Sequence, residues 1–331
     1  MIEVVGSLFW YVVTIGLLVT FHEFGHFWVA RRCGVKVHRF SIGFGKPLWS
    51  RFGRDGTEYV LAAIPLGGYV SMLDERAEEV PPEQLDSALN RKPIWQKIAV
   101  AAAGPAANVL LALLVFWIMF MVGKPDYQPV LGTTTGMAAE AGLKSGMRVT
   151  AIDGEAVDAW SAVHDELTLL AKPRAELEAG KTVYRLGVGP GDRYDHIRIH
   201  GPLAAVPEAI REAWDVSTKS LQFLKDMALG ALSTKHLSGP ITIAQVANLS
   251  ASEGLPWFLG FLGAVSLGLA ILNLLPIPIL DGGHILYYLI ELIKGSPVSD
   301  RGLVAGQYVG LVMLAGLIGL AFFNDLSGFF R

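Results

Sequence analysis

The chain has 331 residues, of which 52% are hydrophobic and only 17% are charged, whereas a typical soluble domain carries about 25% charged residues. The formal net charge of −3 shows no basic excess, which argues against a nucleic-acid-binding protein. The high apolar content argues against disorder, and the single cysteine cannot form an internal disulfide. These values indicate a membrane protein.

The apolar residues are concentrated in four stretches that contain no Asp, Glu, Lys or Arg. A helix needs about 20 residues to cross the hydrocarbon core of a bilayer, and the stretches contain 18, 26, 26 and 23 residues: Val4–Phe21, Ile98–Gly123, Leu255–Leu280 and Gly302–Asn324. We therefore expect a polytopic α-helical membrane protein with four transmembrane helices, within residues 1–35, 96–123, 254–294 and 301–325. The first stretch lacks a preceding positive charge and a cleavage site, so we expect it to be retained rather than removed as a signal peptide.

The positive charges predict the orientation in the membrane. Residues 31–97 contain 11 of the 27 Lys and Arg residues, and none precedes Arg31. Because short loops rich in Lys and Arg stay on the cytoplasmic side, we expect residues 36–95 in the cytoplasm. Both termini and the long segment 124–253 are then expected outside.

The segments outside the four spans have different patterns. Residues 36–73 predict two strands around a turn at Arg54-Asp55-Gly56, and residues 74–95 are typical of a solvated cytoplasmic linker. Residues 124–202 predict a small inserted α+β domain. Residues 203–253 predict an amphipathic helix followed by a connecting loop.

A possible metal site follows the first apolar stretch, in the sequence His22-Glu23-Phe24-Gly25-His26. Helical residues four apart lie about 40° apart around the axis, so both imidazoles can bind one Zn²⁺ ion, and Glu23 can accept a proton from a metal-activated water. The pattern also arises by chance in soluble helices. Ionisable groups beside a membrane span are costly, however, and usually functional. We therefore predict His22 and His26 as zinc ligands and Glu23 as the catalytic residue.

A catalytic zinc ion needs a third protein ligand and one open position. Asp281 is the best candidate, because it follows two prolines and precedes two glycines that should interrupt the third helix. The first and third spans are both expected to run from the outside to the cytoplasm. His22 and Asp281 each lie at the end of one of these spans, so both are expected on the cytoplasmic side. Two alternatives stay open: an ordinary Asp-Gly turn at the membrane surface, and His284 as the third ligand.

Together these motifs resemble those of RseP-type site-2 proteases. The similarity includes the H-E-x-x-H of the first span, the Leu280–Gly283 sequence after the interrupted third span, Ala103–Asn108 in the second and the Gly142–Gly154 module. It covers nearly the whole chain. It implies an intramembrane zinc metalloprotease with His22, His26 and Asp281 as ligands and Glu23 as catalytic acid and base.

The resemblance also implies a mode of substrate binding. It implies that segment 36–73 forms a membrane-reentrant β loop that offers a strand edge to the substrate. The alternative is that this segment forms an ordinary cytoplasmic hairpin. The implied substrate-binding residues are Asn273, Gly43, Gly45, Gly67, Gly68 and Tyr69. The implied substrates are single-span membrane proteins already trimmed outside the membrane, such as the anti-sigma factor RseA and signal-peptide remnants. The implied location is the lipid bilayer of a bacterial inner membrane.

The same resemblance assigns residues 124–202 to a periplasmic PDZ-like domain. Family members with two PDZ domains are longer by about a domain, so we expect here one PDZ-like domain in shortened form. Tyr184–Val188 resembles the loop that receives a peptide carboxylate. The preceding segment, Lys172–Thr182, is too short for the two strands usually expected there, so either the domain is reduced or two PDZ halves have been joined by a deletion. Both alternatives favour a filter or plug over a peptide-binding function.

A second class of function is a transporter or channel whose His, Glu and Asp side chains bind or relay an ion. Four spans without an evident inverted repeat argue against it. A catalytically inactive, chaperone-like relative is disfavoured because all the expected catalytic side chains are present.

Overall fold

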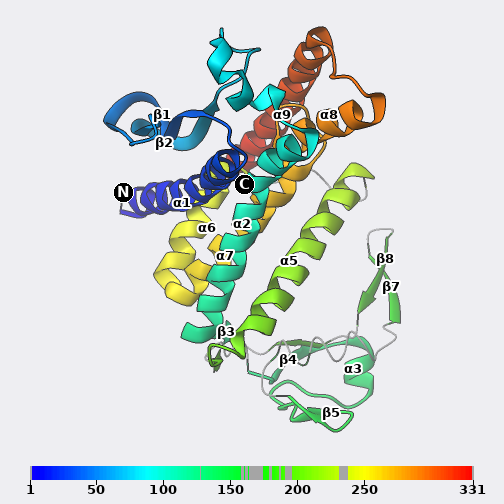
Figure 1. Ribbon diagram of the computed structural model, residues 1–331. Helices are drawn as coiled ribbons and strands as arrows, with labels where there is room; N and C mark the ends of the chain where they lie inside the picture. Colours follow the sequence, from blue (N-terminus) through cyan, green and yellow to red (C-terminus); the bar gives the residue numbers. More distant parts are fainter. Residues whose placement is uncertain are drawn as a thin grey trace. The chain divides into compact units, whose positions relative to one another are not determined.

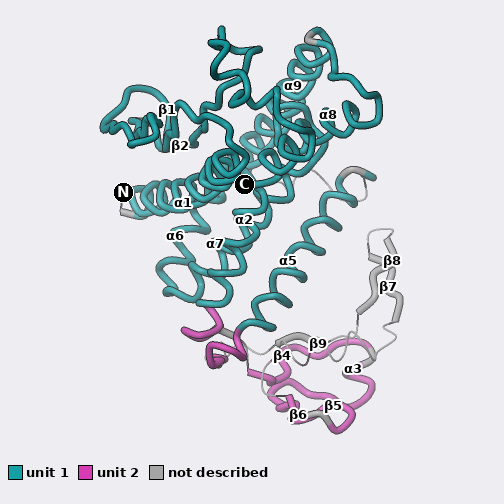
Figure 2. Tube along the Cα trace, in the orientation of Figure 1, with its two compact units in different colours: residues 1–118, 206–331 teal, residues 119–205 magenta. Residues whose placement is uncertain are grey.

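The computed structural model describes residues 2–126, 128–157, 160, 163, 174–178, 181–185, 188–190, 196–230 and 238–329. The chain divides into two compact units (Figure 2), one made of residues 1–118 and 206–331 and the other of residues 119–205. The first unit contains every site residue that the sequence predicts.

Helices dominate the first unit (Figure 1). They are α1 (Ile2–Arg32), α2 (Ile94–Val122), α5 (Ala205–Ala228), α6 (Pro240–Glu253), α7 (Leu255–Leu274), α8 (Asp281–Lys294) and α9 (Asp300–Phe329). Four of them are long and apolar enough to cross a membrane, over Glu3–Arg32, Ile94–Val122, Leu255–Leu274 and Arg301–Ser327. The four spans expected from the sequence are thus present as helices of sufficient length.

The third predicted span consists of two helices. Helix α7 ends at Leu274 and α8 begins at Asp281. Pro276 and Pro278 lie in between, where each lacks the N–H that a continuing helix would need. Ile279, in the same break, has φ of 108°, which is a strained conformation for a β-branched residue. The interruption that the prolines predict therefore lies directly before Asp281.

Two long strands, β1 (Val37–Phe52) and β2 (Glu58–Met72), form an antiparallel sheet that packs against α1. Both strands bend, so Arg39 lies opposite both Glu58 and Ser71. The bends contain glycines with positive φ, which other residues rarely adopt: Gly43, Gly45 and Gly67. The expected strand–turn–strand is present, and these three glycines allow the positive φ angles at which its strands bend.

Residues 73–92 fold against the helices and strands around them. They include two short 3₁₀ helices, Pro82–Ser87 and Leu89–Arg91. Leu73 is buried, its N–H donates to the carbonyl of Lys36, and its own carbonyl accepts from Leu89 N–H. The segment is therefore more ordered than the solvated linker expected from its composition.

Helix α6 occupies part of the expected connecting loop in residues 203–253. The carboxylate of Asp325, on α9, accepts hydrogen bonds from the backbone N–H groups of Gly239, Ile241 and Thr242 and from the Thr242 hydroxyl. A helix N-terminus has N–H groups without partners within the helix. An acceptor from a distant segment therefore caps α6, which the local sequence does not reveal. The amphipathic helix expected before it is present as α5.

The second unit contains short antiparallel strand pairs. The pairs are β3 (Lys124–Asp126) with β10 (His196–Arg198), β4 (Leu131–Thr134) with β9 (Val188–Pro190), β5 (Ala151–Ile152) with β6 (Glu155–Ala156), and β7 (Arg174–Glu178) with β8 (Lys181–Arg185). A short helix, α3 (Gly136–Glu140), follows β4. The β7–β8 hairpin overlaps Lys172–Thr182, which we expected to be too short for two strands. The centre of the Tyr184–Val188 loop lies outside the described residues.

Candidate zinc centre

The two histidines project from the same side of α1. Their Nε2 atoms lie 3.2 Å apart, and their rings meet edge to face at 4.8 Å between centroids. The Nδ1 of His26 donates a hydrogen bond of 2.7 Å to the carbonyl of Val100, on α2. This bond leaves the Nε2 lone pair of His26 free to bind a metal ion. The helical spacing thus brings both nitrogens to one point, as predicted.

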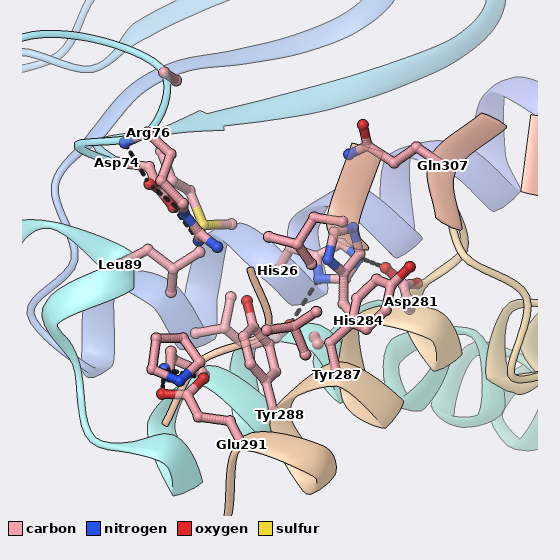
Figure 3. A pocket seen from close by; sticks show the side chains of 18 of the residues that line it. His26, Asp74, Arg76, Leu89, Asp281, His284, Tyr287, Tyr288, Glu291 and Gln307 are labelled. Atoms are coloured by element: carbon pink, nitrogen blue, oxygen red, sulfur yellow. Dashed lines mark hydrogen bonds and ion pairs between the residues drawn. The ribbon is translucent and has the colours of Figure 1, made fainter. Parts of the chain in front are cut away.

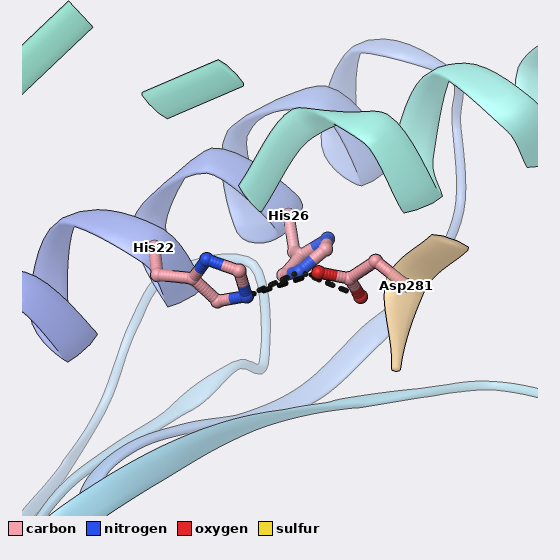
Figure 4. Close-up of side chains that lie close together, drawn as sticks. All are labelled: His22, His26 and Asp281. Carbon is pink, nitrogen blue, oxygen red and sulfur yellow. Dashed lines mark hydrogen bonds and ion pairs between the residues drawn. The ribbon is translucent and has the colours of Figure 1, made fainter. Parts of the chain in front are cut away.

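Asp281 completes a cluster of possible metal ligands with the two histidines (Figure 4). Its carboxylate oxygens lie 3.1 Å from Nε2 of His22 and 3.4 Å from Nε2 of His26. His284 lies one turn further along α8 and is not part of this cluster, although it lines the adjoining cavity. Of the two candidates for the third ligand, the geometry favours Asp281.

The distances in the cluster fit a tetrahedral zinc site. Ligand atoms at about 2.0–2.2 Å from zinc, with tetrahedral angles between them, are separated by about 3.3 Å, and the three separations here are 3.1, 3.2 and 3.4 Å. Oδ2 of Asp281 is buried and makes no hydrogen bond of good geometry with the described residues. A zinc ion would satisfy this carboxylate oxygen and both imidazoles.

Space for an ion beside the histidines depends on Gly104, on α2. A Cβ atom at this position would overlap Nε2 of His26 and lie 2.7 Å from Nε2 of His22. Gly25 allows α1 and α2 to approach this closely, because a Cβ there would overlap the carbonyl of Ala103. The two glycines together leave room at the point where the ligand atoms converge.

Glu23 lies between this cluster and the edge of the sheet. Glu23, on α1, and Val70, on β2, line the same cavity. A Cβ at Gly68 would lie 3.1 Å from Cγ of Glu23 and 2.7 Å from the carbonyl of Ser41. Strand β2 therefore passes directly beside the predicted catalytic side chain at Gly68.

A cavity of about 670 Å³ adjoins the cluster. Glu23, His26 and Asp281 line it, and Figure 3 shows His26 and Asp281 towards one side and Arg76 and Glu291 towards the other. The lining combines these polar groups with apolar side chains such as Met72 and Leu89. Such a cavity beside convergent polar groups is typical of a ligand-binding site.

Two ion pairs lie in the walls of the cavity. Lys97 is 5% exposed and donates to both carboxylate oxygens of Glu291, at 2.7 and 2.8 Å. The other pair joins Asp74 and Arg76, and the Asp74 carboxylate keeps the pKa of the Arg76 guanidinium above its ordinary value. Segment 73–92 thus forms part of the cavity wall.

The predicted substrate-binding residues lie outside the lining of this cavity. Asn273 is half-buried near the end of α7. Tyr69 stacks on Phe44 and accepts a hydrogen bond from Arg39, while a Cβ at Gly67 would overlap the Phe44 ring. These residues shape the bent sheet, and their role in substrate binding stays a prediction.

Several residues of the site were not assigned by sequence reasoning. Val100, Gly104 and Lys97 contribute from α2, and the Ala103–Asn108 motif was noted only as part of the family resemblance. The available signal was the spacing of four between Val100, Gly104 and Asn108, which places them on one face of a helix. Assigning a function to that face requires knowing that it meets α1.

Comparison with known proteins agrees with this geometry. The model of "Peptidase family M50" matches residues 10–317. A protein of Xylella fastidiosa (strain Temecula1) named as a zinc metalloprotease is 41% identical over 442 aligned positions, covering 98% of this chain and all of the relative. "Regulator of sigma-E protease RseP" of Escherichia coli (strain K12) and "Protease RseP" of Yersinia pestis are each 34% identical, covering 99% of this chain and all of each relative. The 442 aligned positions exceed the 331 residues here, so the Xylella relative contains residues that this chain lacks.

Proposed function

The chain belongs to peptidase family M50, and we propose that it hydrolyses peptide bonds within the membrane segments of single-span proteins. It is a zinc metalloprotease, as the family match and the relatives indicate, and its four apolar helices indicate a multi-pass protein of a bacterial inner membrane. The observation that carries the proposal is the His22–His26–Asp281 cluster beside Glu23, in which the histidines lie on the apolar helix α1 and Asp281 is the first residue of α8.

His22, His26 and Asp281 are proposed to hold the zinc ion, which when bound lowers the pKa of a water molecule and polarises a carbonyl group. Glu23 takes a proton from the attacking water and passes it to the nitrogen of the departing amine.

Substrate is proposed to bind as an added strand along β2, beside Glu23. A peptide bond inside a helix is shielded by its own hydrogen bonds, so the substrate must unwind before hydrolysis. Pairing with a free strand edge offers partners to the freed backbone groups. The close approach of β2 to Glu23 at Gly68 supports this proposal, and the residues assigned to substrate contact are Asn273, Gly43, Gly45, Gly67, Gly68 and Tyr69.

Segment 36–73 is proposed to enter the membrane from the cytoplasmic side. Several large apolar side chains of the bent sheet are exposed in the isolated protein, where water would disfavour them: Phe44, Leu48, Trp49, Phe52, Leu61 and Ile64. Positive charges in residues 31–97 favour a cytoplasmic site and outer termini. A hairpin in the cytoplasm would leave this apolar surface in water.

The biological substrates are proposed to be an anti-sigma factor of the RseA type or signal-peptide remnants. The relatives named as regulators of sigma-E protease support regulated intramembrane proteolysis in a stress response. Residues 124–202 are proposed to form a single, shortened PDZ-like domain in the periplasm, acting as a filter for substrates trimmed outside the membrane. The greater length of the relatives supports the loss of a segment, because the aligned positions exceed the chain length.

The test compares wild type with Glu23→Gln, both purified in detergent. We expect one zinc ion per chain in each, and cleavage of a truncated single-span substrate by wild type alone. Mass spectrometry of the products should place the cleaved bond within the apolar segment. Cleavage by Glu23→Gln, or wild type that lacks zinc, would contradict the proposal.

A further inference from the structure

One face of α2 lies against both histidines. Val100, Gly104 and Asn108 follow each other at intervals of four residues, so they lie on the same side of the helix. The carbonyl of Val100 bonds His26, Gly104 leaves the space where the Nε2 atoms converge, and Asn108 reaches His22. Helix α2 thus contacts each histidine ring at Nδ1, the nitrogen that does not face the cluster, through Val100 and Asn108. At Gly104 it also lies beside the Nε2 atoms.

The side chain of Asn108 meets the nitrogen of His22 that does not face the cluster. Its Nδ2 lies 3.3 Å from Nδ1 of His22, while its Oδ1 is buried and has no hydrogen-bond partner among the described residues. Asn108 itself is fully buried. A buried amide oxygen without a donor loses its hydrogen bond to water and gains none in return, so this orientation of the amide is unfavourable.

Zinc binding sets the protonation of His22. Its Nε2 points at Nε2 of His26 and at the Asp281 carboxylate, so this nitrogen must offer a lone pair to the metal. In a neutral imidazole the other nitrogen, Nδ1, then carries the hydrogen and donates. An amide Nδ2 opposite that hydrogen would place two donors face to face. Turning the amide exchanges its nearly indistinguishable oxygen and nitrogen atoms and removes the conflict.

We propose that Asn108 is a positioning residue for the zinc centre, with its Oδ1 accepting the Nδ1–H of His22. It acts on His22 as the Val100 carbonyl acts on His26, so that one face of α2 fixes the tautomer and ring orientation of both ligands. The orphaned oxygen then has a donor. Such outer partners of ligand histidines typically change metal affinity by about 10–100-fold when removed.

The backbone of Asn108 is held independently of its side chain. Ser266, on α7, is fully buried and donates to the Asn108 carbonyl at 2.7 Å. This bond ties α2 to α7 at the level of His22. Removing it changes helix packing and leaves the Asn108 amide in place, which provides a matched control.

The experiment measures zinc affinity directly, by competition with a chromogenic chelator, on full-length protein in detergent. Asn108→Leu keeps a similar volume but removes the acceptor, and we expect zinc to bind about 10–100-fold more weakly. Asn108→Asp keeps an acceptor and lacks a donor, so its affinity should equal or exceed that of wild type. Ser266→Ala should bind zinc as wild type does.

A second measurement uses Co²⁺ in place of zinc, because its visible absorption reports the coordination geometry. Wild type and Asn108→Asp should give the same spectrum, and Asn108→Leu an altered or weaker one. Thermal unfolding of the metal-free proteins separates this effect from misfolding, since Asn108→Leu should unfold near the wild-type temperature. If the Asp variant does not fold, the comparison of Asn108→Leu with Ser266→Ala decides.

The proposal is wrong if Asn108→Leu binds zinc as tightly as wild type, or if Asn108→Asp loses affinity to the same extent as Asn108→Leu. The second outcome would assign the amide nitrogen, and not the oxygen, to His22. The inference rests on the proposed function only through His22 as a zinc ligand. Zinc affinity and Co²⁺ spectra are measured without any substrate. They therefore test the role of Asn108 even if the protein fails to cleave the single-span substrate.

Discussion

His22 and His26 come from one turn of a continuous helix, whereas Asp281 is the first residue of a helix that follows a break. The histidine side depends on the close approach of α1 and α2, through Gly25 and Gly104. The aspartate side depends on the strained loop before Asp281 and on α8. Helices α2 and α9 contact this loop and helix and hold them in place. Local helical geometry therefore pairs the two histidines, whereas only long-range packing brings Asp281 to them.

The largest expected effect comes from filling the space on the histidine side. In Gly104→Ala the new Cβ would overlap Nε2 of His26, so at least one ligand must move. A displacement of about 1 Å at a reacting group can cost about 100-fold in rate, and loss of zinc should take proteolysis to background. Zinc content and cleavage of a single-span substrate measure this. Gly268→Ala, where a Cβ has nothing within 4 Å, is the control and should keep both.

The next effect concerns the far end of α8, on the aspartate side. Lys97→Met leaves Glu291 buried without its partner, which should cost about 3–5 kcal/mol of stability because the two side chains are only 5% and 17% exposed. Chemical unfolding in detergent measures the change. The double variant Lys97→Met/Glu291→Leu should recover most of it. Equal losses in the single and double variants would mean that the pair contributes through packing alone.

A third variant acts on the loop before Asp281. A Cβ at Gly310, on α9, would overlap the carbonyl oxygen of Pro278. Gly310→Ala should therefore shift the loop and lower kcat/KM by about 10–100-fold, since misplaced groups far from the chemistry reduce rates. Gly316→Ala on the same helix meets nothing within 4 Å and should be neutral. Equal activity of the two variants would show that α9 does not position Asp281.

The smallest effect is expected at Glu75, in segment 73–92. Hydrogen bonds from Arg91 and Asn90 lower the pKa of Glu75 from 4.5 to about 2. A carboxyl with a lowered pKa in the folded state stabilises above its unfolded pKa, and this contribution disappears as pH falls from about 4.5 to about 2. Glu75→Gln should therefore remove a small part of the acid dependence of unfolding. An unchanged dependence would assign the acid sensitivity to other carboxylates.

The histidine side and the spans were accessible from the sequence, because both follow from helical periodicity and run length. The residues alone did not decide between Asp281 and His284, since the choice depends on how the chain turns after Pro278. Gly104 and Asn108 gained functions only when α2 was placed against α1. Helix α6 was missed because its acceptor, Asp325, lies more than 80 residues along the chain.

The cap that Asp325 gives α6 also affects biosynthesis. The N–H groups at Gly239, Ile241 and Thr242 precede their acceptor by 83 to 86 residues, with α7, α8 and most of α9 in between. While the ribosome is still making those helices, the first turn of α6 has no Asp325 to bond. Unpaired backbone groups are costly where water is scarce. The α6 region can therefore reach its final hydrogen bonding only after the last span has been synthesised and inserted.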